Sequence, residues 1–131
     1  MRKISIYYLS VLLILVTGCS NQDNVVIIDG DKIKNIELVN NFYSNVQNNE
    51  SSTLVIENRN GIEGQKSTLT YKFDGNNISY EVVEPKENKD FVITCKKIEK
   101  ENKKNITSYN LTKCENTLFE KDSLSIIEIP N

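Results

Sequence analysis

The sequence of 131 residues contains no histidine and no tryptophan, and it has only two prolines and five glycines. The lack of histidine excludes the Ser/His and Cys/His arrangements of nucleophilic catalysis, which leaves carboxylates, lysines and tyrosines as titrating candidates. Zinc binding is disfavoured too, because two thiols without histidine supply half of a four-ligand tetrahedron. The low proline and glycine content excludes a long disordered stalk or a low-complexity tether.

The chain also lacks an apolar run long enough to cross a bilayer, which takes about 20 residues. Its longest run, residues 4–16, is interrupted only by Ser5 and Ser10 and follows the basic residues Arg2 and Lys3. A short apolar core behind a basic start is typical of an export signal.

The string Val16-Thr17-Gly18-Cys19 resembles a bacterial lipobox, in which small residues precede a cysteine that receives a diacylglyceryl group. We therefore predict a signal peptide over residues 1–18, a lipidated N-terminus with a short linker over 19–24, and one globular domain over 25–131. The fatty acids on Cys19, palmitate among them, would hold the protein on the extracytoplasmic face of the cell membrane. Residues 20–24 reach at most about 18 Å, so the domain should lie close to the headgroups.

Removal of residues 1–18 would leave 14 basic residues against 18 acidic ones. A net charge of −4 gives no reason to expect a nucleic-acid partner. The remaining chain is long enough for one modest hydrophobic core but not for two.

Two cysteines, Cys95 and Cys114, remain once Cys19 is assigned to lipid. An even remainder in an exported chain favours a disulfide, and two separate buried thiols are the alternative. The bond would close a loop of about 20 residues and contribute roughly 3 kcal/mol in the chain-entropy model.

Hydrophobic periodicity predicts one helix and a series of strands. The helix should be capped by Asn35 and end near Asn48-Asn49, with apolar residues at three- and four-residue intervals. After the helix, apolar and polar residues alternate every second position. We predict an α+β fold in which one amphipathic helix packs on an antiparallel β-meander of five or six strands. The expected strands are residues 25–29, 53–58, 67–73, 78–84, 91–98, 106–114 and 124–129, of which the first is either a strand or an extended arm.

Two turns carry separate expectations. Asp74-Gly75 is the strongest hairpin signal, but a two-residue and a four-residue turn both keep the same face buried, so the pattern leaves the register open. Asp29 and Asp31 resemble the start of a calcium loop, although the rest of that signature is missing and a turn is the better interpretation.

Three groups of side chains are candidates for chemistry or binding. A pair among Glu57, Glu63, Asp74 and Glu81 would suit acid–base catalysis as in a glycosidase, yet carboxylates on an ordinary solvated face explain them as well. A basic segment within residues 96–113 would suit anionic lipid or an acidic polymer, or would protect an edge hairpin, which we favour. The tyrosines Tyr43, Tyr71, Tyr80 and Tyr109 fit core-facing positions better than a recognition surface.

The ordering of several short motifs resembles a family of small lipoproteins of Gram-positive bacteria that is known only as a domain of unknown function. The similarity spans about residues 25–114, although Gln65-Lys66 stand where that family suggests a proline. It implies a surface lipoprotein and no particular activity. The motifs are Asn35-Ile36, Ile62-Glu63-Gly64, Tyr71, Phe73-Asp74-Gly75, Ile78, Tyr80, Thr94-Cys95, Tyr109 and Cys114.

From the sequence we expect a membrane-anchored binding or interaction module of the cell envelope, with an envelope protein or polymer as its partner. The alternatives are a carboxylate-dependent enzyme acting on an envelope polymer and an accessory or inhibitor protein. We assign no catalytic, cofactor-binding or metal-binding residue, and we expect no cofactor.

Overall fold

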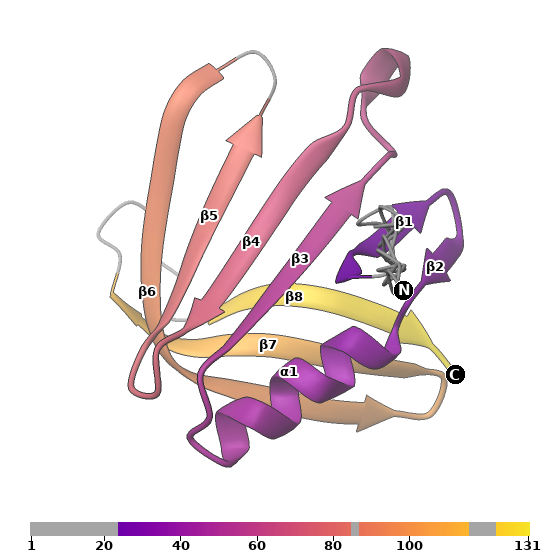
Figure 1. Ribbon diagram of the computed structural model, residues 1–131. Helices are drawn as coiled ribbons and strands as arrows, with labels where there is room; N and C mark the ends of the chain where they lie inside the picture. The colour runs from indigo at the N-terminus through magenta and orange to yellow at the C-terminus, as the bar shows by residue number, and fades with distance from the viewer. Residues whose placement is uncertain (1–23, 85–86, 116–122) are drawn as a thin grey trace, which may run out of the picture.

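The computed structural model describes residues 24–84, 87–115 and 123–131, with the backbone alone for 82–84 and 87–91. The described part consists mainly of β-strands, with one α-helix and one short 3₁₀ turn (Figure 1). In chain order the elements are β1 (Val26–Asp29), β2 (Lys32–Lys34), α1 (Glu37–Gln47), β3 (Ser52–Asn58), η2 (Ile62–Gly64), β4 (Ser67–Phe73), β5 (Ile78–Glu84), β6 (Glu87–Lys103), β7 (Ile106–Glu115) and β8 (Ser123–Pro130).

The eight described strands form one sheet in the order β2-β1-β3-β4-β5-β6-β7-β8. All neighbours are antiparallel except β1 and β3, which pair in parallel. Parallel neighbours need a long crossover, and β2 with α1 supply it here. The predicted antiparallel meander of five or six strands under a helix is therefore wrong: the described residues form one mixed, curled sheet of eight strands with one short helix.

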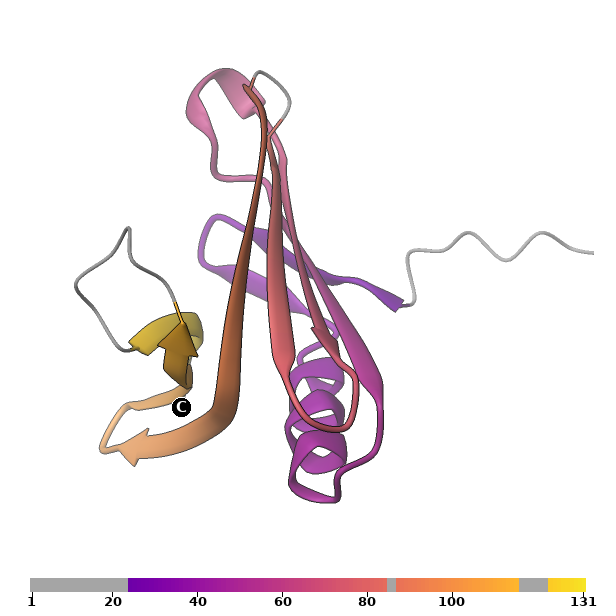
Figure 2. The same ribbon diagram turned by 90° about the vertical axis from the view of Figure 1, so that its left-hand side faces the viewer.

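The curl of the sheet is produced by β6, the longest strand. Figure 1 shows that β7, β8 and the second half of β6 run crosswise to β3, β4 and β5, and Figure 2 shows the bend of β6 from the side. Pairing with β5 ends at Cys95, whereas pairing with β7 covers Thr94 to Lys103. A strand that passes from one layer to another in this way forms the corner of an orthogonal packing.

The inward-facing side of β6 changes at this corner. Ile93 and Cys95 are buried before it and Ile98 after it, so the regular alternation of buried residues is broken between Cys95 and Ile98. Across from the break, Lys113 of β7 has a positive φ of 54°. This left-handed residue marks a local departure from regular strand geometry, and each layer keeps its apolar side on the common core.

The helix lies inside the curl of the sheet and completes the core (Figure 1). Val39, Phe42 and Val46 are buried on its inner face, as the helical spacing predicted. Tyr43 packs edge-to-face on Tyr109 of β7 with ring centroids 5.8 Å apart. The helix therefore contacts both layers. Within the described residues the core has these buried members: Val26, Val39, Phe42, Val46, Leu54, Ile56, Tyr71, Phe73, Ile78, Ile93, Cys95, Ile98, Tyr109, Leu111, Ile126 and Ile127.

The start of the helix differs from the prediction. The residue before the helix is Ile36, and no side chain caps the first turn. Asn35 instead has a φ of 59°, and its amide nitrogen donates to the backbone oxygen of Val25 at 2.8 Å. The asparagine therefore ties the beginning of β1 to the beginning of α1.

The turn after β4 agrees with one of its two predicted alternatives. Phe73 lies opposite Ile78, which selects the four-residue turn after β4. The Asp74 carboxylate accepts hydrogen bonds from the backbone N–H groups of Asn77 and Asn76 at 2.7 and 2.8 Å, and these bonds lower its pKa. The β6–β7 hairpin turns at residues 104–105, so β6 continues to Lys103, beyond the expected strand end at residue 98.

Candidate binding groove

The predicted disulfide between Cys95 and Cys114 is present and joins two residues that lie directly opposite in the β6–β7 register. Cys95 is fully buried. The bond therefore fastens the corner at which β6 changes partners. Cys19 and the predicted signal peptide lie outside the described residues.

The four candidate carboxylates do not meet at one site. Glu57 lies 2.6 Å from the Arg59 guanidinium and 3.5 Å from the Lys66 ammonium. The hydrogen bond from Arg59, with the two positive charges, holds the pKa of Glu57 below its usual range despite some desolvation. The remaining three are occupied or placed elsewhere. Asp74 holds a turn, Glu63 is exposed in η2 and Glu81 pairs with Val92 across β5 and β6.

The other candidates are placed as follows. Asp29 ends β1 and Asp31 follows in the turn, and the described residues contain no group of three or more side chains suited to a metal ion. Tyr71 and Tyr109 are buried and Tyr80 is partly buried, in agreement with a core role. Burial of Tyr71 raises its pKa well above the ordinary value. Its ring stacks on Tyr80 with centroids 5.0 Å apart.

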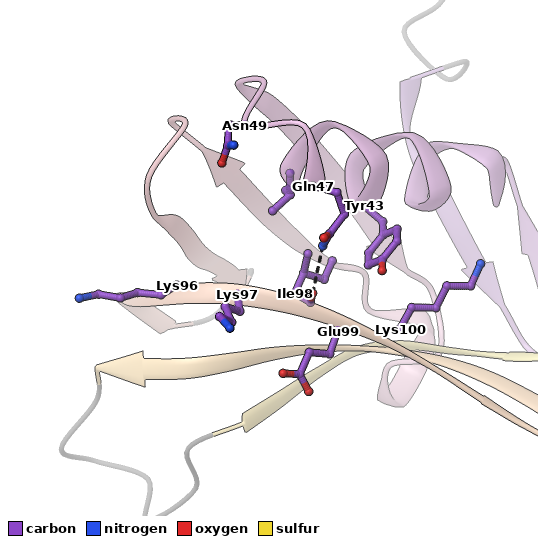
Figure 3. Close-up of a pocket in the computed structure, with 9 residues that line it drawn as sticks. Tyr43, Gln47, Asn49, Lys96, Lys97, Ile98, Glu99 and Lys100 are labelled. Carbon is purple, nitrogen blue, oxygen red and sulfur yellow. Dashed lines mark hydrogen bonds between the residues drawn. The ribbon is translucent and has the colours of Figure 1, made fainter.

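A groove of about 550 Å³ separates the C-terminal half of α1 from the second half of β6 (Figure 3). Its volume is within the range of ligand sites, about 300–1,000 Å³. The side chain of Gln47 reaches across the groove, and its amide nitrogen donates a hydrogen bond to the backbone oxygen of Ile98 at 3.4 Å. The groove is lined by Tyr43, Val46, Gln47, Asn49, Lys96, Lys97, Ile98, Glu99 and Lys100.

The groove carries an excess of positive charge, because three lysines and one glutamate line it. In Figure 3 the side chains of Ile98 and Lys100 are on the helix side of β6, whereas Lys97 and Glu99 point to the other side. Glu99 accepts a hydrogen bond from the Thr112 hydroxyl at 3.3 Å, across on β7. Its carboxylate therefore does not offset the charge on the helix side.

The lysines are held to different degrees. Lys96 lies 3.5 Å from Glu115, but both side chains are well exposed, so this pair contributes little. The Lys100 ammonium lies over the Tyr109 ring, 5.4 Å from its centroid. Within the part of the chain that the structure describes, neither Lys97 nor Lys100 forms an ion pair. These two cations remain available to an acidic ligand.

A second hollow of about 370 Å³ lies where the curl brings the first two strands close to the last one. Ile28, Ile33 and Ile127 make it largely apolar, and Asp31 and Glu128 stand on its lining. The charged residues of this lining, Asp31 and Glu128, are both acidic and exposed. Two exposed carboxylates beside an apolar floor select no particular ligand.

The sequence indicated the lysines of the groove as a basic segment but not its opposite wall. Gln47 and Asn49 belong to the polar end of a helix and carry no motif of their own. Only the position of the helix across β6 gives them a role.

The described residues contain no helix that is long and apolar enough to cross a membrane. Comparison of the chain with models of protein families, with curated proteins and with solved structures finds no match. The resemblance to a family of small lipoproteins stays a prediction from the motifs.

Proposed function

We propose that this chain is a lipid-anchored protein of the cell envelope whose domain binds a partner through the groove between α1 and β6. The observation that carries the anchoring is the string Val16-Thr17-Gly18-Cys19 behind a short apolar run. The disulfide of Cys95 and Cys114 supports an oxidising compartment, since such bonds are rare in reducing cytoplasm.

The place where the lipidated N-terminus would enter the domain leaves the groove accessible to a partner. Asn35 ties the start of β1 to the start of α1, so the lipidated end would approach the domain at the N-terminal end of the helix. The groove lies along the C-terminal half of the same helix. The 11 residues of α1 span about 16 Å, which leaves the groove away from the anchor.

Binding is the function that the groove supports best, because its lining combines lysines and amides without a pair of carboxylates. A glycosidase-type mechanism needs two carboxyl groups about 5–10 Å apart around the substrate, and Glu57, Glu63, Asp74 and Glu81 are absent from this lining. An accessory or inhibitor protein would use the same groove to hold its target.

Anchoring is tested by expressing the full chain in a bacterium that processes lipoproteins. We expect a mature product that begins at Cys19, carries a diacylglyceryl group by mass spectrometry and sediments with membranes. The Cys19→Ser variant should keep its leader and incorporate no labelled palmitate, whereas a Cys95→Ser/Cys114→Ser variant should still be lipidated. An unlabelled product with its initiator methionine would refute the proposal.

A further inference from the structure

The second half of β6 has an open backbone edge toward the groove. Its partner on one side is β7, from Lys97 to Lys103, whereas β5 reaches only to Cys95 on the other side. No described strand therefore pairs with the groove side of residues 96–103. The helix lies across this edge but leaves the space of the groove between them (Figure 3).

Two observations define which backbone groups point into the groove. The hairpin closes on the pair Lys103 and Ile106 around a two-residue turn, so alternate residues from Lys103 backward exchange hydrogen bonds with β7. The oxygen of Ile98 instead accepts from Gln47 of the helix. Both observations agree that Ile98, Lys100 and Asn102 direct their N–H and C=O groups to the open edge.

An open edge of this kind accepts an extended peptide as an additional strand, with main-chain hydrogen bonds that supply affinity. The side chains around this edge add selectivity. Lys100 projects on the helix side and Lys97 on the other, and neither has an ion-pair partner in the described structure. A strand laid beside β6 would place its own side chains alternately next to these two lysines.

We propose that the open edge of β6 in this groove binds an extended acidic segment of a partner protein as an added β-strand. The inference rests on the proposed binding function and names the chemistry of its partner. Lysines on an open edge repel strands of like charge, which is how natural edges avoid unwanted pairing. The same lysines attract a strand that carries carboxylates.

The charge pattern disfavours a second copy of this chain as the occupant. Two β6 edges paired around a two-fold axis would bring Lys96, Lys97 and Lys100 of one copy toward the same residues of the other, and opposed like charges are destabilising. A polyanion without a peptide backbone would use the lysines alone and leave the N–H groups of Lys100 and Asn102 unbonded. These occupants are separate outcomes of the test.

The test uses the full chain in a zwitterionic detergent and a labelled nine-residue peptide of alternating valine and glutamate. Three comparison ligands accompany it: the alternating valine and lysine peptide, the glutamate peptide with alternate backbone nitrogens methylated, and inorganic polyphosphate. We expect the lysine peptide and the methylated peptide to bind at least about tenfold more weakly, because one lacks the charge and the other the donors. Polyphosphate should bind without the backbone signature described next.

The backbone signature is amide hydrogen exchange. The glutamate peptide should slow exchange at Ile98, Lys100 and Asn102 by at least about tenfold, because their N–H groups become bonded. Exchange at Glu99 and Glu101, which already pair with β7, should change little. Lys100→Glu should weaken peptide binding by about tenfold or more, and Lys72→Glu, an exposed lysine of β4, serves as the matched control.

Equal binding of the methylated peptide, or binding without protection at Lys100 and Asn102, would overturn strand addition in favour of a polyanion site. A sedimentation shift to dimers without peptide would favour a second copy and equally overturn it. The result is separable from anchoring: a chain that is not lipidated but protects these amides contradicts only the membrane proposal. A lipidated chain that binds no acidic peptide contradicts only this inference.

Discussion

The two halves of β6 belong to one strand but to different layers of the fold. The first half, up to Cys95, continues the layer of β3, β4 and β5, whereas the second half, from Lys96 to Lys103, pairs with β7. In the first layer the hairpin turn after β4 and the alternation of Tyr71 with Phe73 build a closed apolar face. The second layer begins with lysines and an open edge.

This difference shows how one strand can serve both stability and binding. Before the corner, β6 is held by β5 and contributes Ile93 and Cys95 to the core. After it, Ile98 alone of residues 96–103 is buried, and the backbone faces a groove. The disulfide of Cys95 and Cys114 lies at the boundary between these two halves of β6. It fastens the bend in the sheet, so the bend does not depend on a strand partner for the open edge.

The largest expected effect comes from removing the largest buried side chain of the helix. Phe42 on the inner face of α1 is 1% exposed and belongs to the core that both layers share. Phe42→Ala should lower the free energy of unfolding by about 3–5 kcal/mol, because it removes buried apolar contacts and leaves a cavity. Chemical denaturation measures the change.

The matched control is Asn41→Ala, an exposed position beside Phe42 on the same helix. It should change the free energy of unfolding by no more than about 0.5 kcal/mol. If both variants unfold at the same denaturant concentration as the unaltered protein, the helix does not connect the layers.

The next effect tests the corner itself. The variant Cys95→Ala/Cys114→Ala removes the bond that closes a 19-residue separation and should lower the free energy of unfolding by about 3 kcal/mol. Reductant should shift the denaturation midpoint of the unaltered protein in the same direction. It should leave the double variant unchanged, and an equal response of both proteins would show that reduction acts elsewhere.

Much of the local structure could be predicted from the sequence, because alternation and turn residues act over short distances. Once the hairpin turns at residues 104–105, counting residues back from the turn places Cys95 opposite Cys114. Alternation reports which face of a strand is buried but not which strand lies beside it. The parallel pairing of β1 with β3 and the curl of the sheet therefore escaped prediction.

Two further misses have local causes. Residues 32–34 form a strand of only three residues with an exposed lysine at each end, a pattern that a turn also shows. Asparagine is a common helix cap, but the side chain of Asn35 donates its hydrogen bond to Val25 instead. The sequence gives no sign that these two residues lie close together. For the groove, the lysines were visible in the sequence, but the open edge depends on where β5 begins.

A smaller effect sharpens the contrast between the paired and the open half of β6. Gln47→Ala removes the hydrogen bond that the helix side chain donates to the backbone of the open edge, at Ile98. The free energy of unfolding should fall by about 0.5–1.5 kcal/mol, measured by chemical denaturation. Because the oxygen of Ile98 then becomes available, the acidic peptide should bind this variant at least as tightly as the unaltered protein. Weaker binding would mean that Gln47 contacts the ligand.

The smallest effect concerns acid stability in the first layer, at the turn that Asp74 holds. The N–H groups of Asn77 and Asn76 lower the pKa of Asp74 below its ordinary value of 3.8. A carboxyl group whose pKa is lower in the folded state stabilises the fold above its unfolded pKa, and that stability is lost as the pH falls through the folded value.

Asp74→Asn keeps the side-chain oxygen that accepts these bonds but removes the charge. The variant should be slightly less stable than the unaltered protein near neutral pH, and the difference should vanish in strong acid, as measured by denaturation at both pH values. A difference that persists unchanged in acid would assign the effect to the shape of the turn, because the charge of Asp74 is then absent from both proteins.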